Sequence, residues 1–167
     1  MFNIGDTIVY GNQGVFNIES IIQQNIGGTA ADYFLLRSSF DSRTVIYVPC
    51  GNEKLLSRMR NILSVGEVNS LIDSIPRLDD LWIDNEAARI EKHKAILSSG
   101  DRTQILSLIT TLYRHKANCQ EKGKKMHQRD ERVFKEAERL IYDEFALVLG
   151  IPQKDVVSYI DHRLEDK

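Results

Sequence analysis

The sequence predicts an α+β protein, in which a small antiparallel β-barrel or strongly bent sheet is followed by an α-helical bundle. Short runs of β-branched and aromatic residues, separated by glycine-containing turns, fill the first sixty residues. From about residue 64 onward, apolar residues recur at the spacing of about 3.6 that is typical of helices. The length of 167 residues is enough for two small globular units. We therefore predict a β domain at residues 1–63 and a helical domain at residues 64–167.

Closely spaced strands account for the first domain. Four strands are predicted over Asp6–Tyr10, Gly14–Gln23, Tyr33–Arg37 and Arg43–Val48, and a weaker fifth over Met59–Leu63. Glycine or polar residues separate the first four, and no helical pattern interrupts them. Strands arranged in this way along a chain are typical of an antiparallel barrel or bent sheet.

Helix-capping and helix-breaking residues divide the second domain into five predicted helices. The first begins near Val65 and ends at Pro76, and the others cover about 81–98, 102–122, 128–149 and 152–162. Asp79 or Asp80 is the predicted N-cap of the second helix, and Asp101 is that of the third. Glycines at positions 100, 123 and 150 supply the helix ends.

The net charge of −2 conceals an uneven distribution of charge along the chain. Residues 63–101 carry eight acidic and four basic side chains, whereas residues 102–133 carry three acidic and eight basic ones. The basic stretch allows two interpretations: a local contact with a polyanion such as nucleic acid, or a solvated helix face.

Several classes of protein are disfavoured by the sequence. No apolar run approaches the roughly 20 residues of a membrane span, and the first residues do not resemble a secretory signal. Two cysteines, Cys50 and Cys119, suit a reducing cytoplasm, which is the expected location. His115 and Cys119 are one helical turn apart but lack a second pair of metal ligands. We expect no enzyme activity, no metal and no cofactor.

Spaced motifs resemble one family over nearly the whole chain. Phe2-x-x-Gly5-Asp6-x-Ile8-Val9-Tyr10, Tyr33-Phe34-Leu35-Leu36 and Thr44-Val45-x-x-Val48-Pro49-x-x-Asn52 are similar to the N-terminal module of the CarD/CdnL transcription regulators. Leu97-x-Ser99-Gly100-Asp101 is similar to a helix junction in the C-terminal domain of that family.

The resemblance implies a transcription regulator that bridges RNA polymerase and promoter DNA. Family members are bacterial proteins whose Tudor-like β module, shared with the transcription-repair coupling factor, docks on the polymerase β subunit. Their helical domain contacts DNA at the upstream edge of the open-complex bubble, where a tryptophan wedges into the minor groove. The expected role is modulation of open-complex stability, with neither a membrane nor a small-molecule substrate involved. The expected location is the cytoplasm, with association to the nucleoid through polymerase.

The resemblance places polymerase-binding residues in the β module. They are Gln24, Arg43, Ile46 and Tyr47. Gln24 and Tyr47 stand where the family has basic residues, and Asn12-Gln13 replaces its usual Pro-His in the first turn.

Candidate DNA-binding residues fall in two groups. Trp82 is the only tryptophan, and it lies about one helical turn farther from Ser99-Gly100-Asp101 than the family's wedge; Arg89 and Lys92 share its predicted helix flank. The second group consists of Lys124, Lys125, Arg129, Arg132, Lys135 and Arg139.

Each group also has a structural alternative. Trp82 is either an exposed wedge or an aromatic residue buried between the two domains. The basic stripe either contacts phosphates or pairs with the neighbouring acids Glu136, Glu138 and Asp143. The alternative function is therefore an adaptor on RNA polymerase that makes no direct DNA contact.

Overall fold

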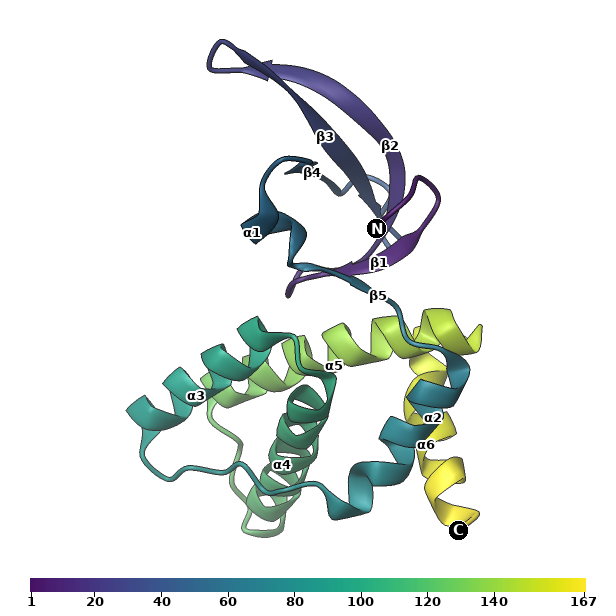
Figure 1. Ribbon diagram of the computed structural model, residues 1–167. Coiled ribbons are helices and arrows are strands. Elements are labelled where there is room, and N and C mark those ends of the chain that lie inside the picture. The colour runs from purple at the N-terminus through teal and green to yellow at the C-terminus, as the bar shows by residue number, and fades with distance from the viewer. The chain divides into compact units, whose positions relative to one another are not determined.

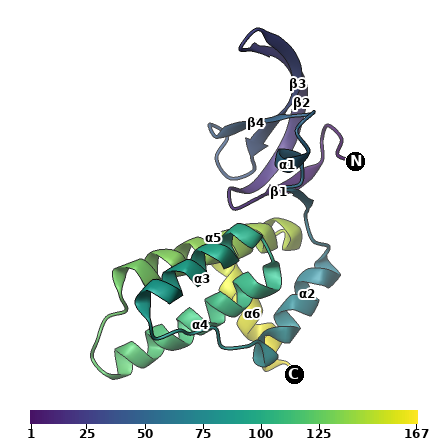
Figure 2. The same ribbon diagram turned by 60° about the vertical axis from the view of Figure 1, so that its left-hand side comes forward.

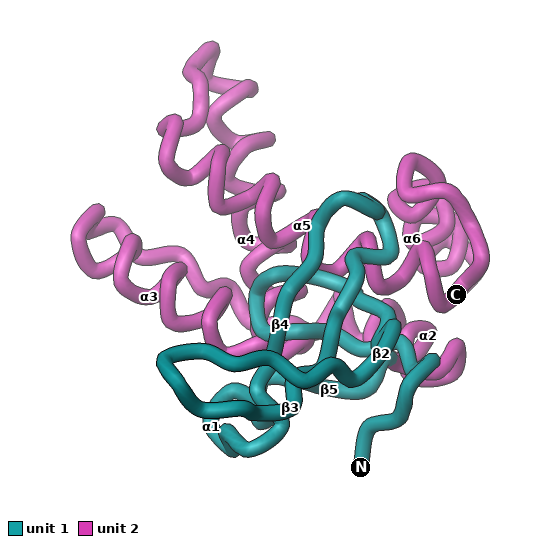
Figure 3. Tube along the Cα trace, turned by 90° about the horizontal axis from the view of Figure 1, so that it is seen from above, with its two compact units in different colours: residues 1–62 teal, residues 63–167 magenta.

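The computed structural model describes residues 1–167, which divide into two compact units, residues 1–62 and 63–167 (Figure 3). The division lies one residue before the predicted boundary. The first unit contains five strands and one short helix, and the second contains only helices. The fold class is therefore α+β, as predicted. None of the helices combines the length and the apolar character that a membrane span requires.

The first unit is built on one antiparallel sheet (Figure 1). Its strands are β1 (Thr7–Tyr10), β2 (Gly14–Ile26), β3 (Thr29–Ser38), β4 (Val45–Pro49) and β5 (Met59–Asn61). Their order in the sheet is β4-β3-β2-β1-β5, so β4 and β5 are the two edge strands. The sheet is open, because the edge strands do not pair with each other.

Strands β2 and β3 extend beyond their predicted ends because a tight turn joins them. Gly27 and Gly28 have φ angles of 65° and 85°, and Ile26 pairs directly with Thr29. A two-residue hairpin turn of this kind needs positive φ at both positions, which glycine adopts without strain. A shift in register between Ile18 and Ser20 places one extra residue in β2. Such a bulge bends a strand.

The core of the β unit lies on one face of the sheet, where a helix that the sequence analysis missed covers part of it. Helix α1 (Glu53–Leu56) begins at Asn52, whose side chain accepts a hydrogen bond from the Leu55 backbone N–H at 3.1 Å. Leu55 and Leu56 pack against the buried residues Ile8, Tyr10, Phe16, Ile18, Leu36, Val48 and Met59. The helix has only four residues, too few for a periodic apolar pattern to reveal it.

The second unit is a helical bundle (Figure 2). Its elements are α2 (Val65–Ser74), η1 (Ile75–Arg77), α3 (Glu86–Ser99), α4 (Arg102–Glu121), α5 (Gln128–Leu149), η2 (Gln153–Asp155) and α6 (Val156–Glu165). Asp101 caps α4 as predicted, and Gly100 and Gly150 end α3 and α5 in the left-handed conformation. The last helix begins later than predicted, because a 3-10 turn precedes it.

The segment before α3 departs from the predicted helix. The helix starts at Glu86 instead of Leu81, and its N-cap is Asn85, which accepts a hydrogen bond from Ala88 N at 2.9 Å. Asp80 instead accepts from the backbone N–H of Trp82 at 2.9 Å. The backbone N–H of Leu81 donates to Thr111 Oγ1 of α4, also at 2.9 Å. These contacts hold residues 81–84 outside the helix, so the prediction that Asp79 or Asp80 begins it is wrong.

Candidate functional site

Edge strand β4 leaves part of its main chain unpaired. The backbone N–H of Ser38 donates to the carbonyl of Thr44 at 3.0 Å, which fixes the pattern of hydrogen bonds between β3 and β4. Hydrogen-bonded and non-bonded pairs alternate in antiparallel sheets, so Ile46 bonds to β3 while Val45 and Tyr47 turn their N–H and C=O groups outward. No other backbone group of the chain pairs with these two residues. The edge is therefore open to a further strand.

Two of the predicted docking residues share a face of the sheet, and a third lies on the opposite face. Tyr47 is opposite Leu35 of β3, and Gln24 of β2 is opposite Ala31. Leu35 and Ala31 are four residues apart in β3, so they share a face and are separated by about 13 Å. Tyr47 and Gln24, their cross-strand neighbours, therefore share that face as well. Tyr47 is 47% exposed, whereas Ile46 packs against the core of the β unit. Ile46 is thus half-buried on the core face, and its predicted contact with polymerase stays a prediction.

Arg43 lies in the loop before β4 instead of in the strand, which begins at Val45. Its side chain is 92% exposed, and its Nε atom lies 3.3 Å from Asp41 Oδ1. Asp41 also accepts hydrogen bonds from the backbone N–H of Arg43 and from the hydroxyl of Thr44. The backbone hydrogen bond, with these others, holds the pKa of Asp41 below its usual value. An anionic turn therefore accompanies the basic side chain at the start of the open edge.

Three side chains of the helical unit hold Trp82 in place. The imidazole of His115 stacks on the indole with ring centroids 3.6 Å apart and planes inclined by 19°. The guanidinium carbon of Arg89 lies 4.4 Å from the centroid, and because the imidazole fills one face, Arg89 must lie on the other. The indole N–H donates to Asp84 Oδ1 at 2.9 Å. Both faces of this half-buried ring are covered, within the helical unit alone.

Arg89 is buried in the helical unit, and its predicted contact with DNA beside Trp82 stays a prediction. Only 7% of the residue is exposed, and its Nε and Nη2 atoms each donate to a carboxylate oxygen of Asp130 at 3.1 Å. Its Nη1 atom donates to the carbonyls of Ile83 and Asp84 at 2.9 and 3.1 Å. The guanidinium is thus occupied inside the unit. Its observed contacts position Trp82 and connect the start of α3 to the start of α5.

Two histidines next to this ion pair are kept neutral by burial. His93 is 2% exposed, and His115 is half-buried under the indole. Burial lowers the pKa of both imidazoles, and the positive charge of Arg89 lowers it further against the opposing effect of Asp130. His115 Nε2 lies 3.5 Å from the Sγ atom of Cys119, but no third metal-ligating side chain joins them. His115 therefore acts as a neutral stacking partner for Trp82.

The predicted basic stripe lies on the exposed side of α5. Arg132, Lys135 and Arg139 are all exposed. Neither Arg132 nor Lys135 forms a salt bridge, and Asp143, a predicted partner of the stripe, accepts a hydrogen bond from Gln153. Lys124 and Lys125 are exposed in the turn before the helix.

Not every predicted cation is equally accessible. Arg129 Nη1 lies 3.5 Å from Glu86 Oε1, and Lys92 is half-buried. Asp130, which binds Arg89, lies in the first turn of α5, so Trp82 is held near the beginning of the stripe. Arg139 is nine residues farther along, a separation of about 14 Å.

Asp130 and His115 are the functional candidates that the sequence analysis missed. Asp130 lies among basic residues in the chain, and His115 stands out in the sequence only as one half of an incomplete metal-ligand set with Cys119. Both residues act through contacts with partners that are distant in the sequence. Asp130 binds Arg89, 41 residues away, and His115 of α4 stacks on Trp82, which precedes α3. A single sequence carries no local signal for such contacts.

A comparison with known protein families finds a match over the β unit. The family model of the CarD-like/TRCF RID domain matches residues 2–61. The match spans all five strands and α1, and it includes the open edge of β4. Residues 2–61 therefore form an RNA polymerase-interacting domain of the CarD-like/TRCF RID family.

Proposed function

We propose that this protein is a non-enzymatic transcription regulator that docks on the β subunit of RNA polymerase and contacts promoter DNA. The observation that carries the proposal is the open main-chain edge of β4 within an RNA polymerase-interacting domain. Main-chain hydrogen bonds to an added strand provide affinity, and nearby side chains provide specificity. Tyr47 and Arg43 are the side chains best placed for the second role.

A proline scan of β4 tests docking through the main chain. Tyr47→Pro removes an N–H that faces outward, so the β unit should fold while polymerase binding weakens by roughly tenfold or more. Tyr47→Ala keeps the N–H and removes the side chain, and it should retain more binding. Ile46→Pro is the control for folding, because its N–H bonds to β3 and its loss should lower the melting temperature. Binding to the isolated β-subunit lobe can be measured by biolayer interferometry, and unchanged binding of Tyr47→Pro would exclude this edge.

The exposed stripe on α5 supports the DNA contact of the proposal. Arg132 and Lys135 have no salt-bridge partner, and cations on one helix face can meet successive phosphates without reading sequence. Trp82 lies near one end of the stripe, but His115 and Arg89 cover its two faces. To insert between bases, the indole has to leave the His115 stack. That cost would accompany formation of the open complex.

Salt titration tests the DNA contact. Arg132→Ala/Lys135→Ala/Arg139→Ala should lower the slope of log affinity against log salt by roughly 2 to 3 on a forked promoter fragment. The matched control, Arg77→Ala/Lys154→Ala, removes two exposed cations outside α5 and should leave the slope unchanged. An unaltered slope in the triple variant, with polymerase binding retained, would favour the adaptor without DNA contact.

A further inference from the structure

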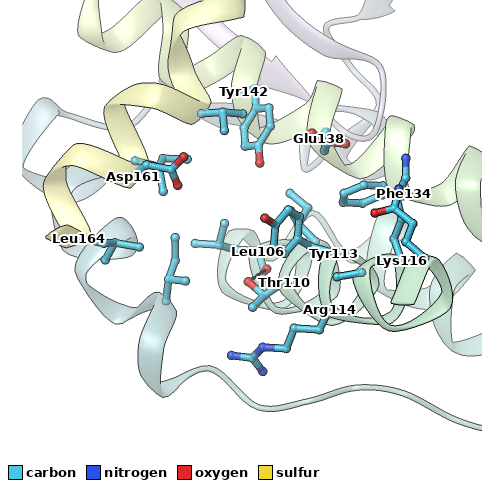
Figure 4. A pocket seen from close by; sticks show the side chains of 16 residues that line it. Leu106, Thr110, Tyr113, Arg114, Lys116, Phe134, Glu138, Tyr142, Asp161 and Leu164 are labelled. Carbon is cyan, nitrogen blue, oxygen red and sulfur yellow. Dashed lines mark hydrogen bonds between the residues drawn. The ribbon is translucent and has the colours of Figure 1, made fainter. Parts of the chain in front are cut away.

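The helical unit contains a mainly apolar groove that neither proposed surface uses. It has a volume of about 600 Å³ and is bounded by α4, α5, α6 and one residue of η1 (Figure 4). No residue of α3 lines it. Helix α3 packs elsewhere on the bundle, through the Arg89–Asp130 pair and against α4. Part of the α4–α5 pair is therefore left without a covering helix.

The groove has the length and the surface of a helix-binding site. Leu106, Tyr113, Ala117 and Gln120 line it from α4 and fall within about 60° of one another around the helix. These residues span fourteen residue steps of α4, or about 21 Å. The groove is therefore long enough for a bound helix of about 15 residues. Thr111, which bonds to the segment before α3, lies about 140° around from Leu106. The groove and the α3 side are therefore different faces of α4.

Large side chains are left exposed along this face. Tyr113 is 66% exposed and Val157 of α6 is 46% exposed. Figure 4 shows Tyr142 entering the same space from α5, with Phe134 to one side and Leu164 to the other. Aromatic residues with both an apolar ring and a polar end are typical of the centres of protein interfaces.

The charges around the groove favour a basic occupant. Glu138 of α5 and Asp161 of α6 both line it, and neither forms a salt bridge. Both carboxylates lie close enough to Tyr142 to contribute to its raised pKa, after the larger effect of burial. Lys116, the cation near Glu138, is bound to Glu131 at 2.8 Å. The remaining cation that lines the groove, Arg114, is exposed on α4. The two acids without a salt bridge, Glu138 and Asp161, therefore outnumber it.

We propose that this groove binds an amphipathic helix of a partner protein, whose apolar stripe packs on α4 and α5 and whose lysine or arginine side chains face Glu138 and Asp161. Apolar positions spaced three and four residues apart would fill the groove, as in other helix-in-groove complexes. The flanking cations would fix the orientation of the helix through charge complementarity. This binding needs neither polymerase nor DNA, so its test is separate from those of the proposed function.

Two stapled peptides of about 15 residues test the proposal. Both carry the same leucine stripe, but one has lysine and the other glutamate on the flank. Added to the ¹⁵N-labelled full chain, the lysine peptide should shift amide signals around the groove and bind at least about tenfold more tightly than the glutamate peptide. Glu138→Gln/Asp161→Asn should abolish this preference. Tyr113→Asp, an exposed change, should weaken binding of both peptides.

The control pair Asp155→Asn/Glu165→Gln removes two exposed acids near α6 that do not line the groove, and it should preserve the preference. Absence of shifts at about 1 mM lysine peptide would overturn the proposal, as would equal affinity for both peptides in the parent chain. Sedimentation provides a further check. A dimer that dissociates in Tyr113→Asp would assign the groove to a second copy of the chain and would also overturn the proposal.

Discussion

The β unit and the helical unit present their candidate surfaces through different parts of the polypeptide. At the edge of β4, the unpaired groups are the N–H and C=O of Val45 and Tyr47, which every non-proline residue possesses. Around Trp82, the contacts are made by the side chains of His115, Arg89 and Asp84. Binding at the edge of β4 should therefore tolerate side-chain substitutions, whereas the arrangement around Trp82 should not.

Burial separates the two surfaces further. The Arg89 and Asp130 side chains retain 8% and 3% of their exposure, whereas Arg43 beside β4 retains 92%. A buried ion pair is costly to break, because the remaining charge has no water to solvate it. Exposed pairs contribute little, since water and salt compete for them. Substitutions around Trp82 should thus affect folding as well as binding.

Breaking the buried ion pair should have the largest effect. Asp130→Asn leaves the Arg89 guanidinium buried without its counter-charge, and we expect a loss of about 3–5 kcal/mol in the unfolding free energy. Fluorescence in urea is a suitable probe, because the only tryptophan lies in the helical unit. Asp73→Asn is the matched control: it also removes an arginine partner, but the pair is more exposed, and the loss should be much smaller. Equal losses would contradict the distinction by burial.

Truncation of the indole should cost less than loss of the ion pair. Trp82→Ala removes a half-buried ring and its stack on His115, so we expect about 2 kcal/mol, below the 3–5 kcal/mol typical of a fully buried tryptophan. Urea unfolding followed by circular dichroism gives this value. Trp82→Phe preserves an aromatic stack and loses the hydrogen bond to Asp84, and about 1 kcal/mol should be lost. If Trp82 is a wedge, open complexes formed with Trp82→Ala should decay faster than the loss of folded protein accounts for.

A pH titration should distinguish the two units by a smaller effect. Burial lowers the pKa of His93 below its ordinary value of 6.5, so near and below that pH the unfolded chain binds more protons than the folded one. Stability of the helical unit should therefore decrease as the pH falls through about 6.5. His93→Phe should reduce the slope, and His162→Gln, at an exposed position, should leave it unchanged. An equal slope for His93→Phe and the parent would exclude His93 as its cause.

The smallest effect on stability is expected at the open edge of β4. Arg43→Glu changes a side chain in a solvated loop, so the melting temperature of the β unit should remain unchanged. Polymerase binding should weaken if Arg43 guides docking, and surface plasmon resonance at two salt concentrations would detect this. Binding that is unchanged at low salt would exclude Arg43 from docking and leave the main chain of β4 and Tyr47 as the determinants at this edge.

Local patterns in the sequence determined most of the fold. Short runs of β-branched and aromatic residues between glycine or polar turns predicted the strands, and Asp101 and Gly150 marked helix ends where the structure has them. These features depend on residues only a few positions apart, through side-chain direction, capping and turn geometry. The motifs spread over residues 2–52 likewise indicated the family of the β unit.

Only the tertiary structure decided which of the candidate residues are accessible. Arg89 and Arg132 are the same type of residue on neighbouring helices, yet one is buried against Asp130 and the other is exposed. Helix α3 starts at Glu86 instead of the predicted Leu81, because the backbone N–H of Leu81 donates a hydrogen bond to Thr111, thirty residues away. The physical reason is that burial and hydrogen bonding depend on partners that folding brings together, whereas propensity and periodicity depend only on neighbours in the chain.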